Sequence, residues 1–224
     1  MKPMTEGLLA VLRQHMVEAV AIHAELAREE LGKAALDPRV MAAMGRVPRH
    51  LFVPGPLAAP AYHDAPLPIG FGKTISQRFV AAVVTDLLDP RPHEAVLEVG
   101  TGLGYQAAVL AGLARRVWTV EVVEEFAAAA EARFRQLGLA NVGVRVGDGT
   151  RGWAERAPFD KIIVTAAARE VPPALLVQLG PGGRMVLPTG DAEAQRLTVV
   201  DKDADGRVGL RELMDVRFAP LETA

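Results

Sequence analysis

The 224-residue sequence contains no cysteine, so it can form neither a disulfide nor a thiolate metal site, and it needs no oxidising compartment. It also lacks an excess of positive charge, because the formal net charge is −2 and gives no overall basic surface for nucleic acid. No apolar run is long enough to span a bilayer, and Glu6, Arg13 and Glu18 interrupt the segment that an export signal would need. These absences predict a soluble, cytoplasmic protein that binds neither nucleic acid nor a membrane.

A glycine-rich turn is the most informative segment that is present. Residues 95–99 form an apolar run typical of a strand, and three alternating glycines follow it: Gly100, Gly102 and Gly104. Such a turn leaves bare N–H groups at a helix start, where a ligand can lie close. Tyr105 stands where a dinucleotide fingerprint needs its third glycine, which disfavours nicotinamide or flavin binding. With Glu98 before it, the turn resembles motif I of the S-adenosylmethionine-dependent methyltransferases, and we expect cofactor contacts from Glu98, Gly100, Thr101, Gly102 and Gly104.

Two carboxylates follow later strands. The run Arg116–Glu121 predicts a second strand that ends 21 positions after Gly100, close to the spacing of about 20 at which an acid meets ribose hydroxyls. Glu121 is therefore a candidate ribose ligand, and a cap of the next helix is the alternative. A third strand leads into Asp148 and Gly149, which we expect beside adenine, with a plain Asp-Gly turn as the alternative.

Strand and helix patterns alternate after Glu94, which predicts an α/β fold with a wound, mostly parallel sheet. The expected strands are Ala95–Val99, Val117–Glu121, Val142–Val146, Lys161–Thr165, Arg184–Leu187, Leu197–Val200 and Leu213–Phe218. The expected helices are Tyr105–Ala114, Glu124–Leu137 and Pro172–Leu179. Ligands of such sheets lie at the carboxyl ends of the strands, where the glycine turn, Glu121, Asp148 and Thr165 would meet.

The sequence resembles the protein-L-isoaspartate O-methyltransferase family from about residue 37 to its end. The segments that carry the resemblance are RVPRHLFVP from Arg46, PLPIG from Pro66, TISQ from Thr74, EVGTGLGYQAA from Glu98, APFD from Ala157, TAAA from Thr165, GGR from Gly182 and FAPL from Phe218. The resemblance implies a Rossmann-like, seven-stranded methyltransferase sheet with helices on both faces and an added N-terminal region. We expect one domain over residues 1–224, with a helical and substrate-loop region at 1–75 and the core at 76–224.

The resemblance also implies an activity, which is S-adenosylmethionine-dependent methylation of the α-carboxylate of L-isoaspartyl residues in damaged proteins and peptides. A carboxylate with a pKa of about 4 is already ionised near neutral pH, so catalysis reduces to alignment and the removal of water. By the same resemblance Ser76 is the active-site residue, and Ile75, Ser76 and Ala219 contact the substrate. From the residues alone, a pure helix N-cap is the alternative for Ser76.

The substrate loop departs from the family pattern at Phe71, Lys73 and Arg78, where a glutamine-rich stretch and a proline are usual. Two added cations favour carboxylate capture, whereas the loss of the proline frees the backbone and the long arginine is expected to obstruct a protein substrate. Other functions therefore stay open: a carboxyl methyltransferase for a dedicated peptide or other substrate, or a noncatalytic cofactor-binding relative that acts through a partner.

Two further segments need an interpretation. Asp201 to Glu212 satisfies a calcium-loop pattern, but its flanks alternate like strands, so Asp205-Gly206 is better explained as a hairpin turn and no metal is expected. Leu8 to about Leu31 has helical periodicity in its apolar residues and ends at Gly32. This helix is longer than the family's usual opening, so we expect a monomer with a helix-mediated dimer as the alternative.

Overall fold

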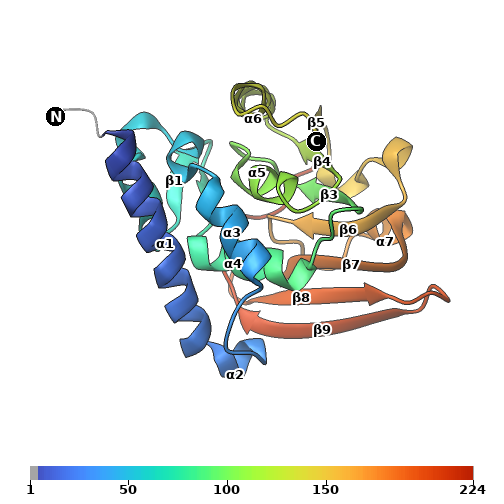
Figure 1. Ribbon diagram of the computed structural model, residues 1–224. Helices are drawn as coiled ribbons and strands as arrows, with labels where there is room; N and C mark the ends of the chain where they lie inside the picture. The colour runs from blue at the N-terminus through green and yellow to red at the C-terminus, as the bar shows by residue number, and fades with distance from the viewer. Residues whose placement is uncertain (1–4, 224) are drawn as a thin grey trace.

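The computed structural model describes residues 5–223, so both ends of the predicted domain, residues 1–4 and 224, lie outside the described part. Its main sheet has seven strands in the order β5-β4-β3-β6-β7-β8-β9 (Figure 1). Their bounds are β3 Ala95–Val99, β4 Arg116–Glu121, β5 Val142–Val146, β6 Phe159–Val164, β7 Leu179–Gly190, β8 Gln195–Lys202 and β9 Val208–Asp215. Strands β3 to β7 pair in parallel and β8 and β9 pair antiparallel, which confirms the predicted mostly parallel sheet.

The strand order places a crevice beside β3. After β3 the chain continues outward through β4 and β5, and then returns to the opposite side of β3 with β6. Helices on either side of such a reversal leave a gap at the carboxyl ends of the strands, which is where ligands bind in this type of sheet. The glycine turn follows β3 directly and therefore lies at the mouth of this gap.

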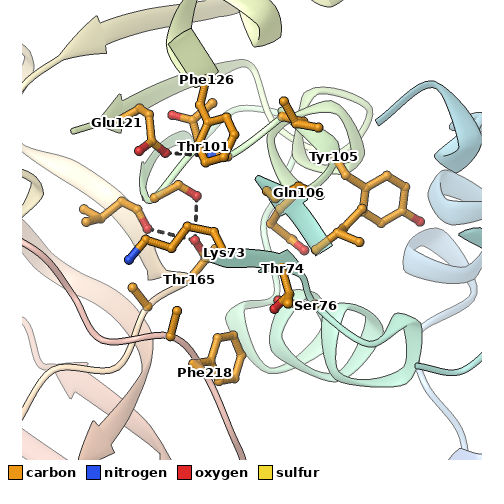
Figure 2. A pocket seen from close by; sticks show the side chains of 18 of the residues that line it. Lys73, Thr74, Ser76, Thr101, Tyr105, Gln106, Glu121, Phe126, Thr165 and Phe218 are labelled. Carbon is orange, nitrogen blue, oxygen red and sulfur yellow. Dashed lines mark hydrogen bonds between the residues drawn. The ribbon is translucent and has the colours of Figure 1, made fainter. Parts of the chain in front are cut away.

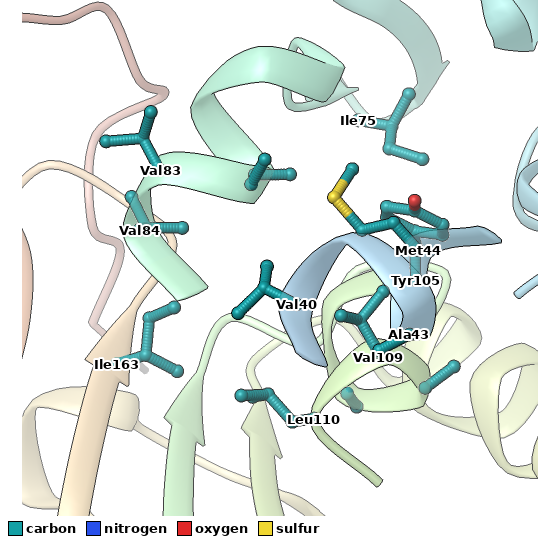
Figure 3. Packing of buried hydrophobic residues seen from close by; sticks show 14 of the residues in the cluster. Val40, Ala43, Met44, Ile75, Val83, Val84, Tyr105, Val109, Leu110 and Ile163 are labelled. Carbon is teal, nitrogen blue, oxygen red and sulfur yellow. The ribbon is translucent and has the colours of Figure 1, made fainter. Parts of the chain in front are cut away.

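Helices cover both faces of the sheet. Their bounds are α4 Arg78–Leu88, α5 Tyr105–Ala111, α6 Glu124–Gln136 and α7 Pro173–Gln178. Alternate residues of β3 enter different clusters, because Val96 packs in the core with α4 and α5 whereas Leu97 packs in a second cluster with Leu175 of α7. Figure 3 shows the first cluster, in which Val84 of α4 lies next to Ile163 of β6.

The N-terminal region lies against α4 (Figure 1). It comprises α1 Glu6–Leu26, α2 Arg28–Leu31, α3 Pro38–Arg46, and three short 3₁₀ turns, η1 Arg49–Phe52, η2 Gly55–Leu57 and η3 Pro60–Tyr62. A small hairpin then follows, formed by β1 Leu67–Gly70 and β2 Lys73–Ile75. The remaining 3₁₀ turns are η4 Gly149–Arg151 and η5 Ala154–Arg156. None of the helices within residues 5–223 has the length and apolar character that a bilayer crossing requires.

The structure corrects some predicted elements. The first helix stops at Leu26 and a separate turn, α2, precedes Gly32, whose φ of 70° ends it as expected. Of the apolar residues that the helical spacing predicts on one face, Leu8, Leu12, Met16 and Val20, the last two are buried and Leu12 packs against the core, whereas Leu8 is 47% exposed and Leu9 is buried in its place. The helix after Ser76 begins at Arg78 with Gln77 as its N-cap, so the N-cap alternative for Ser76 is wrong.

The calcium-like segment lies in the hairpin between β8 and β9, as its flanking strand patterns predict. The Asp203 carboxylate accepts hydrogen bonds from the N–H groups of Asp205 and Arg207 and so closes the turn itself. The last strand begins at Val208, earlier than the predicted Leu213, because the turn brings Val208 opposite Lys202. Within residues 5–223 no group of three or more acidic or histidine side chains is arranged to hold a metal ion.

Candidate active site

A cavity of about 1050 Å³, part of it open to solvent, lies at the carboxyl ends of β3, β4 and β6. In the view of Figure 2, Glu121 and Phe126 lie at one end of it and Ser76 and Phe218 at the other. Of the predicted site residues, the structure brings the following to its wall: Ile75, Ser76, Gly100, Thr101, Gly102, Glu121, Gly149, Thr165 and Ala219. Glu98, Gly104 and Asp148 lie outside the wall.

The glycine turn has the backbone that its sequence indicates. Gly100, Gly102 and Gly104 have φ values of 92°, 52° and 98°, which residues other than glycine rarely adopt. The Gly102 N–H donates to one carboxylate oxygen of Glu121 at 2.7 Å, and the Val123 N–H donates to the other at 3.0 Å. An ionised carboxylate has about four acceptor positions, so Glu121 keeps two for hydroxyl groups of a ligand.

Glu98 lies behind this turn and does not face the cavity. Its side chain is fully buried, and one oxygen accepts from the Thr119 hydroxyl while the other has no hydrogen-bond partner among residues 5–223. The Thr119 hydroxyl is 2.6 Å from that of Thr101, so a chain of polar groups links β3, β4 and the turn. Burial raises the pKa of Glu98 to about 8, and the charge of Glu121 adds to the rise, so Glu98 is neutral at pH 7.

Three more predicted cofactor residues lie around the turn with distinct local roles. The Thr165 hydroxyl donates to the Gly100 carbonyl at 2.5 Å, which ties β6 to the turn after β3. The Asp148 carboxylate accepts from the N–H and hydroxyl of Thr150 and caps η4. Gly149 packs so tightly on Val99 that a Cβ atom there would collide with it. Thr165 and Gly149 are therefore part of the wall, whereas Asp148 lies outside it and fixes the backbone of η4, which begins at Gly149.

The hairpin of β1 and β2 lies over the cavity. Its tip residue Phe71 packs edge to face on Phe126 of α6, with ring centroids 5.2 Å apart. Lys73 pairs with Glu222 of the C-terminal segment at 2.5 Å, so both segments meet across the cavity mouth. This hairpin is not among the elements that the sequence predicts, because its tip holds the bulky Phe71 at a φ of 50°, which is unfavourable for such a residue.

Ser76 follows β2 and reaches the cavity from the side opposite Glu121 (Figure 2). Its hydroxyl has no hydrogen-bond partner among the described residues, so it is available to a substrate oxygen. Ile75 is buried beside it, and Ala219 lies in the C-terminal segment held to Ala167 by a backbone hydrogen bond of 2.8 Å. The three predicted substrate residues thus meet at one end of the cavity.

The expectation for Arg78 is wrong, whereas that for Lys73 stays a prediction. Lys73 lines the cavity and pairs with Glu222, and Arg78 points away from the cavity, donating to the Tyr62 carbonyl and pairing with Asp64 at 3.4 Å. Arg78 therefore neither obstructs the cavity nor strengthens carboxylate capture, because its partners lie in η3 and the loop after it. Among the lining residues that the site prediction missed, Arg49 is a fully buried cation. Its only sequence signal was its place in the RVPRHLFVP segment.

These residues fit a nucleoside-bearing cofactor. Glu121 retains acceptor positions for ribose hydroxyls, the apolar surface of Phe126 suits a planar base, and the turn lets the ligand approach the backbone closely. The strand order, the antiparallel end of the sheet and the carboxylate that ends β4 define the class as a Rossmann-like methyltransferase fold.

The chain belongs to the protein-L-isoaspartate(D-aspartate) O-methyltransferase family, whose model matches residues 22–224. The protein-L-isoaspartate O-methyltransferase 1 of Polaromonas sp. is 52% identical over 221 residues, which are 99% of this chain and 94% of that relative. The protein-L-isoaspartate O-methyltransferase 2 of Syntrophobacter fumaroxidans is 52% identical over 210 residues, which are 93% of this chain and 85% of that relative.

Solved structures show the same fold. A putative protein-L-isoaspartate O-methyltransferase of Plasmodium falciparum, solved with S-adenosyl-L-homocysteine, superimposes with a TM-score of 0.77 at 22% identity. The match covers 95% of this chain and 99% of that one. A further protein-L-isoaspartate O-methyltransferase structure has a TM-score of 0.75 at 26% identity, covering 89% of this chain and 65% of that one.

Proposed function

We propose that this chain transfers a methyl group from S-adenosylmethionine to the α-carboxylate of L-isoaspartyl residues in damaged proteins and peptides. The observation that carries the proposal is that Ser76 and Glu121, on separate segments, line one cavity of a chain that belongs to the family. Glu121 and the glycine turn hold the cofactor at one end, and Ser76 holds the acceptor at the other.

The residues of the chain have simple tasks in this reaction. The bound cofactor supplies a methyl group on a positively charged sulfur, and the acceptor carboxylate is already ionised near neutral pH. The Ser76 hydroxyl donates a hydrogen bond to the acceptor and orients it, which lowers the entropy cost of alignment. The β1–β2 hairpin and the C-terminal segment, joined by Lys73 and Glu222, exclude water from the cavity.

A second groove supports a polypeptide substrate. This groove has a volume of about 1200 Å³, including space open to solvent, and runs between the start of α4 and the end of β9. It shares the following residues with the first cavity: Thr74, Ser76, Thr165, Phe218 and Ala219. An extended chain can therefore lie in the groove while one side group reaches Ser76.

The test compares an isoaspartyl peptide with its aspartyl twin in a methyl-transfer assay. We expect methylation of the isoaspartyl peptide only, because its extra backbone methylene moves the carboxylate relative to Ser76. The Ser76→Ala variant should lose transfer rate while its affinity for S-adenosylhomocysteine, measured by calorimetry, stays within threefold of wild type.

Two outcomes would favour other functions. Cofactor binding without methylation of isoaspartyl peptides, under conditions where a control enzyme works, would favour a dedicated peptide substrate. Cofactor binding without transfer to any tested peptide would favour a noncatalytic role.

We propose that the active unit is a monomer. The outer face of α1 nevertheless exposes Leu8, Val11, Ile22 and Leu26. Light scattering across a concentration series tests the assembly, because a dimer through α1 would double the mass and would dissociate on changing Ile22 and Leu26 to glutamate.

A further inference from the structure

Arg49 is a fully buried cation in the wall of the candidate active site. Its Nε donates to the Ala61 carbonyl at 2.9 Å and its Nη2 donates to the Ser76 carbonyl at 2.5 Å. The guanidinium carbon lies 4.5 Å from the centre of the Tyr105 ring. Within residues 5–223, its Nη1 has no hydrogen-bond partner and no acidic oxygen lies within 4.0 Å of the guanidinium.

A buried charge without a counter-charge is costly, so its persistence in this position calls for an explanation. Desolvation lowers the pKa of Arg49, yet arginine remains protonated in proteins. The neighbouring cations Lys73 and Arg78 both have acidic partners. Arg49 thus provides positive charge at the acceptor end of the cavity that these protein carboxylates do not neutralise.

The hydrogen bond to Ser76 also sets the direction of a peptide group. Because this peptide is trans, its C=O and N–H point in opposite directions, so the Gln77 N–H points away from Arg49. This N–H precedes the first turn of α4 and has no acceptor among residues 5–223. A cation bound to the carbonyl polarises the peptide and strengthens its N–H as a donor.

We propose that Arg49 is a positioning residue that holds and polarises the Ser76–Gln77 peptide and makes the acceptor site selective for an anionic carboxylate. The proposal rests on the function proposed above. In methyl transfer a carboxylate oxygen bonds to the methyl carbon, the carbon–sulfur bond breaks, and its electron pair stays on sulfur. The acceptor changes from an anion to a neutral ester, so the attraction from Arg49 disappears and the product leaves more readily.

The experiment measures peptide binding to the protein loaded with S-adenosylhomocysteine. The probes are an isoaspartyl peptide with a free α-carboxylate and the same peptide with an α-carboxamide. In the wild type we expect at least tenfold tighter binding of the carboxylate peptide. Arg49→Met should reduce this preference to less than threefold, while the affinity for S-adenosylhomocysteine stays unchanged.

Two variants separate the possible causes. Arg49→Lys keeps the charge but cannot bridge both carbonyls, so it should retain the carboxylate preference and lower kcat at least tenfold. Arg133→Met is the matched control, because Arg133 also donates to a main-chain carbonyl, that of Leu51, and does not line the cavity. It should leave the preference as in the wild type.

The proposal is overturned if folded Arg49→Met keeps the wild-type preference, whether the two affinities stay unchanged or fall by the same factor. If Arg49→Met does not fold, Arg49→Lys decides: a retained preference with kcat lowered at least tenfold supports the proposal, and a lost preference or an unchanged kcat overturns it. A wild type that neither methylates the isoaspartyl peptide nor prefers the carboxylate refutes the proposed function instead.

Discussion

Replacing Glu98 by glutamine should remove a component of the pH dependence of stability. Glu98 is fully buried, and burial raises its pKa from 4.5 to about 8. Between these two values the folded protein holds a proton that the unfolded chain releases, so the free energy of unfolding falls as the pH rises. The contribution is fully present below pH 4.5 and is lost as the pH passes through about 8.

The magnitude follows from the linkage of one proton. Each pH unit inside this window changes the free energy of unfolding by about 1.4 kcal/mol, so the interval from pH 5 to pH 8 involves about 4 kcal/mol. Glutamine resembles the neutral acid in shape but does not titrate. Its amide adds donors in a place where one Glu98 oxygen already has no partner, which gives a cost that does not vary with pH.

Urea unfolding of both proteins at half-unit steps from pH 5 to pH 8 measures the difference. We expect the wild type to lose stability relative to Glu98→Gln along this range, and the exposed Glu124→Gln control to follow the wild type. If the free energy of unfolding changes with pH in the same way in the wild type and in Glu98→Gln, the conclusion that folding raises the pKa of Glu98 is refuted.

Three other substitutions test the site. Glu121→Ala should weaken S-adenosylhomocysteine binding about 10- to 150-fold in calorimetry, since charge-assisted hydrogen bonds contribute about 1.5 to 3 kcal/mol; an unchanged Kd contradicts the ribose role. Gly104→Ala should lower the free energy of unfolding by more than about 1 kcal/mol, because the added Cβ would lie 2.7 Å from Phe134. Gly72→Ala is the control and should cost less, because Gly72 also has a positive φ but a Cβ there would meet no atom within 4 Å beyond its chain neighbours. Equal costs for the two variants would contradict the packing argument. Arg78→Pro should lose about 1 to 3 kcal/mol of stability, because the side-chain contacts of Arg78 are lost. Proline itself is compatible with the first position of α4, so Arg78→Ala should lose a similar amount. An unchanged melting temperature would show that these contacts contribute nothing to stability.

Local patterns in the sequence were sufficient to predict the sheet and the glycine turn and carboxylate that line one end of the cavity. The apolar run before Gly100, the alternating glycines and the carboxylate at the end of Arg116–Glu121 all depend on residues close together in the chain. Strand and helix periodicity also depends on near neighbours, so the parallel strands could be predicted with errors mainly at their ends. The hairpin at Phe71 was missed because its positive φ opposes local preference and a distant contact with Phe126 accompanies it.

The partners of the charged side chains could be found only in the tertiary structure. The sequence does not show that Lys73 and Arg78 are paired. Lys73 pairs with Glu222, which is 149 positions further along the chain, and Arg78 pairs with Asp64. Arg49 belongs to an ordinary motif in the sequence, and only the packing around it shows a buried charge beside Ser76. The pairing and burial of a charge depend on which distant segments surround it, so the sequence by itself determined the fold and the glycine turn beside the cavity, and the tertiary structure decided the electrostatics around Ser76.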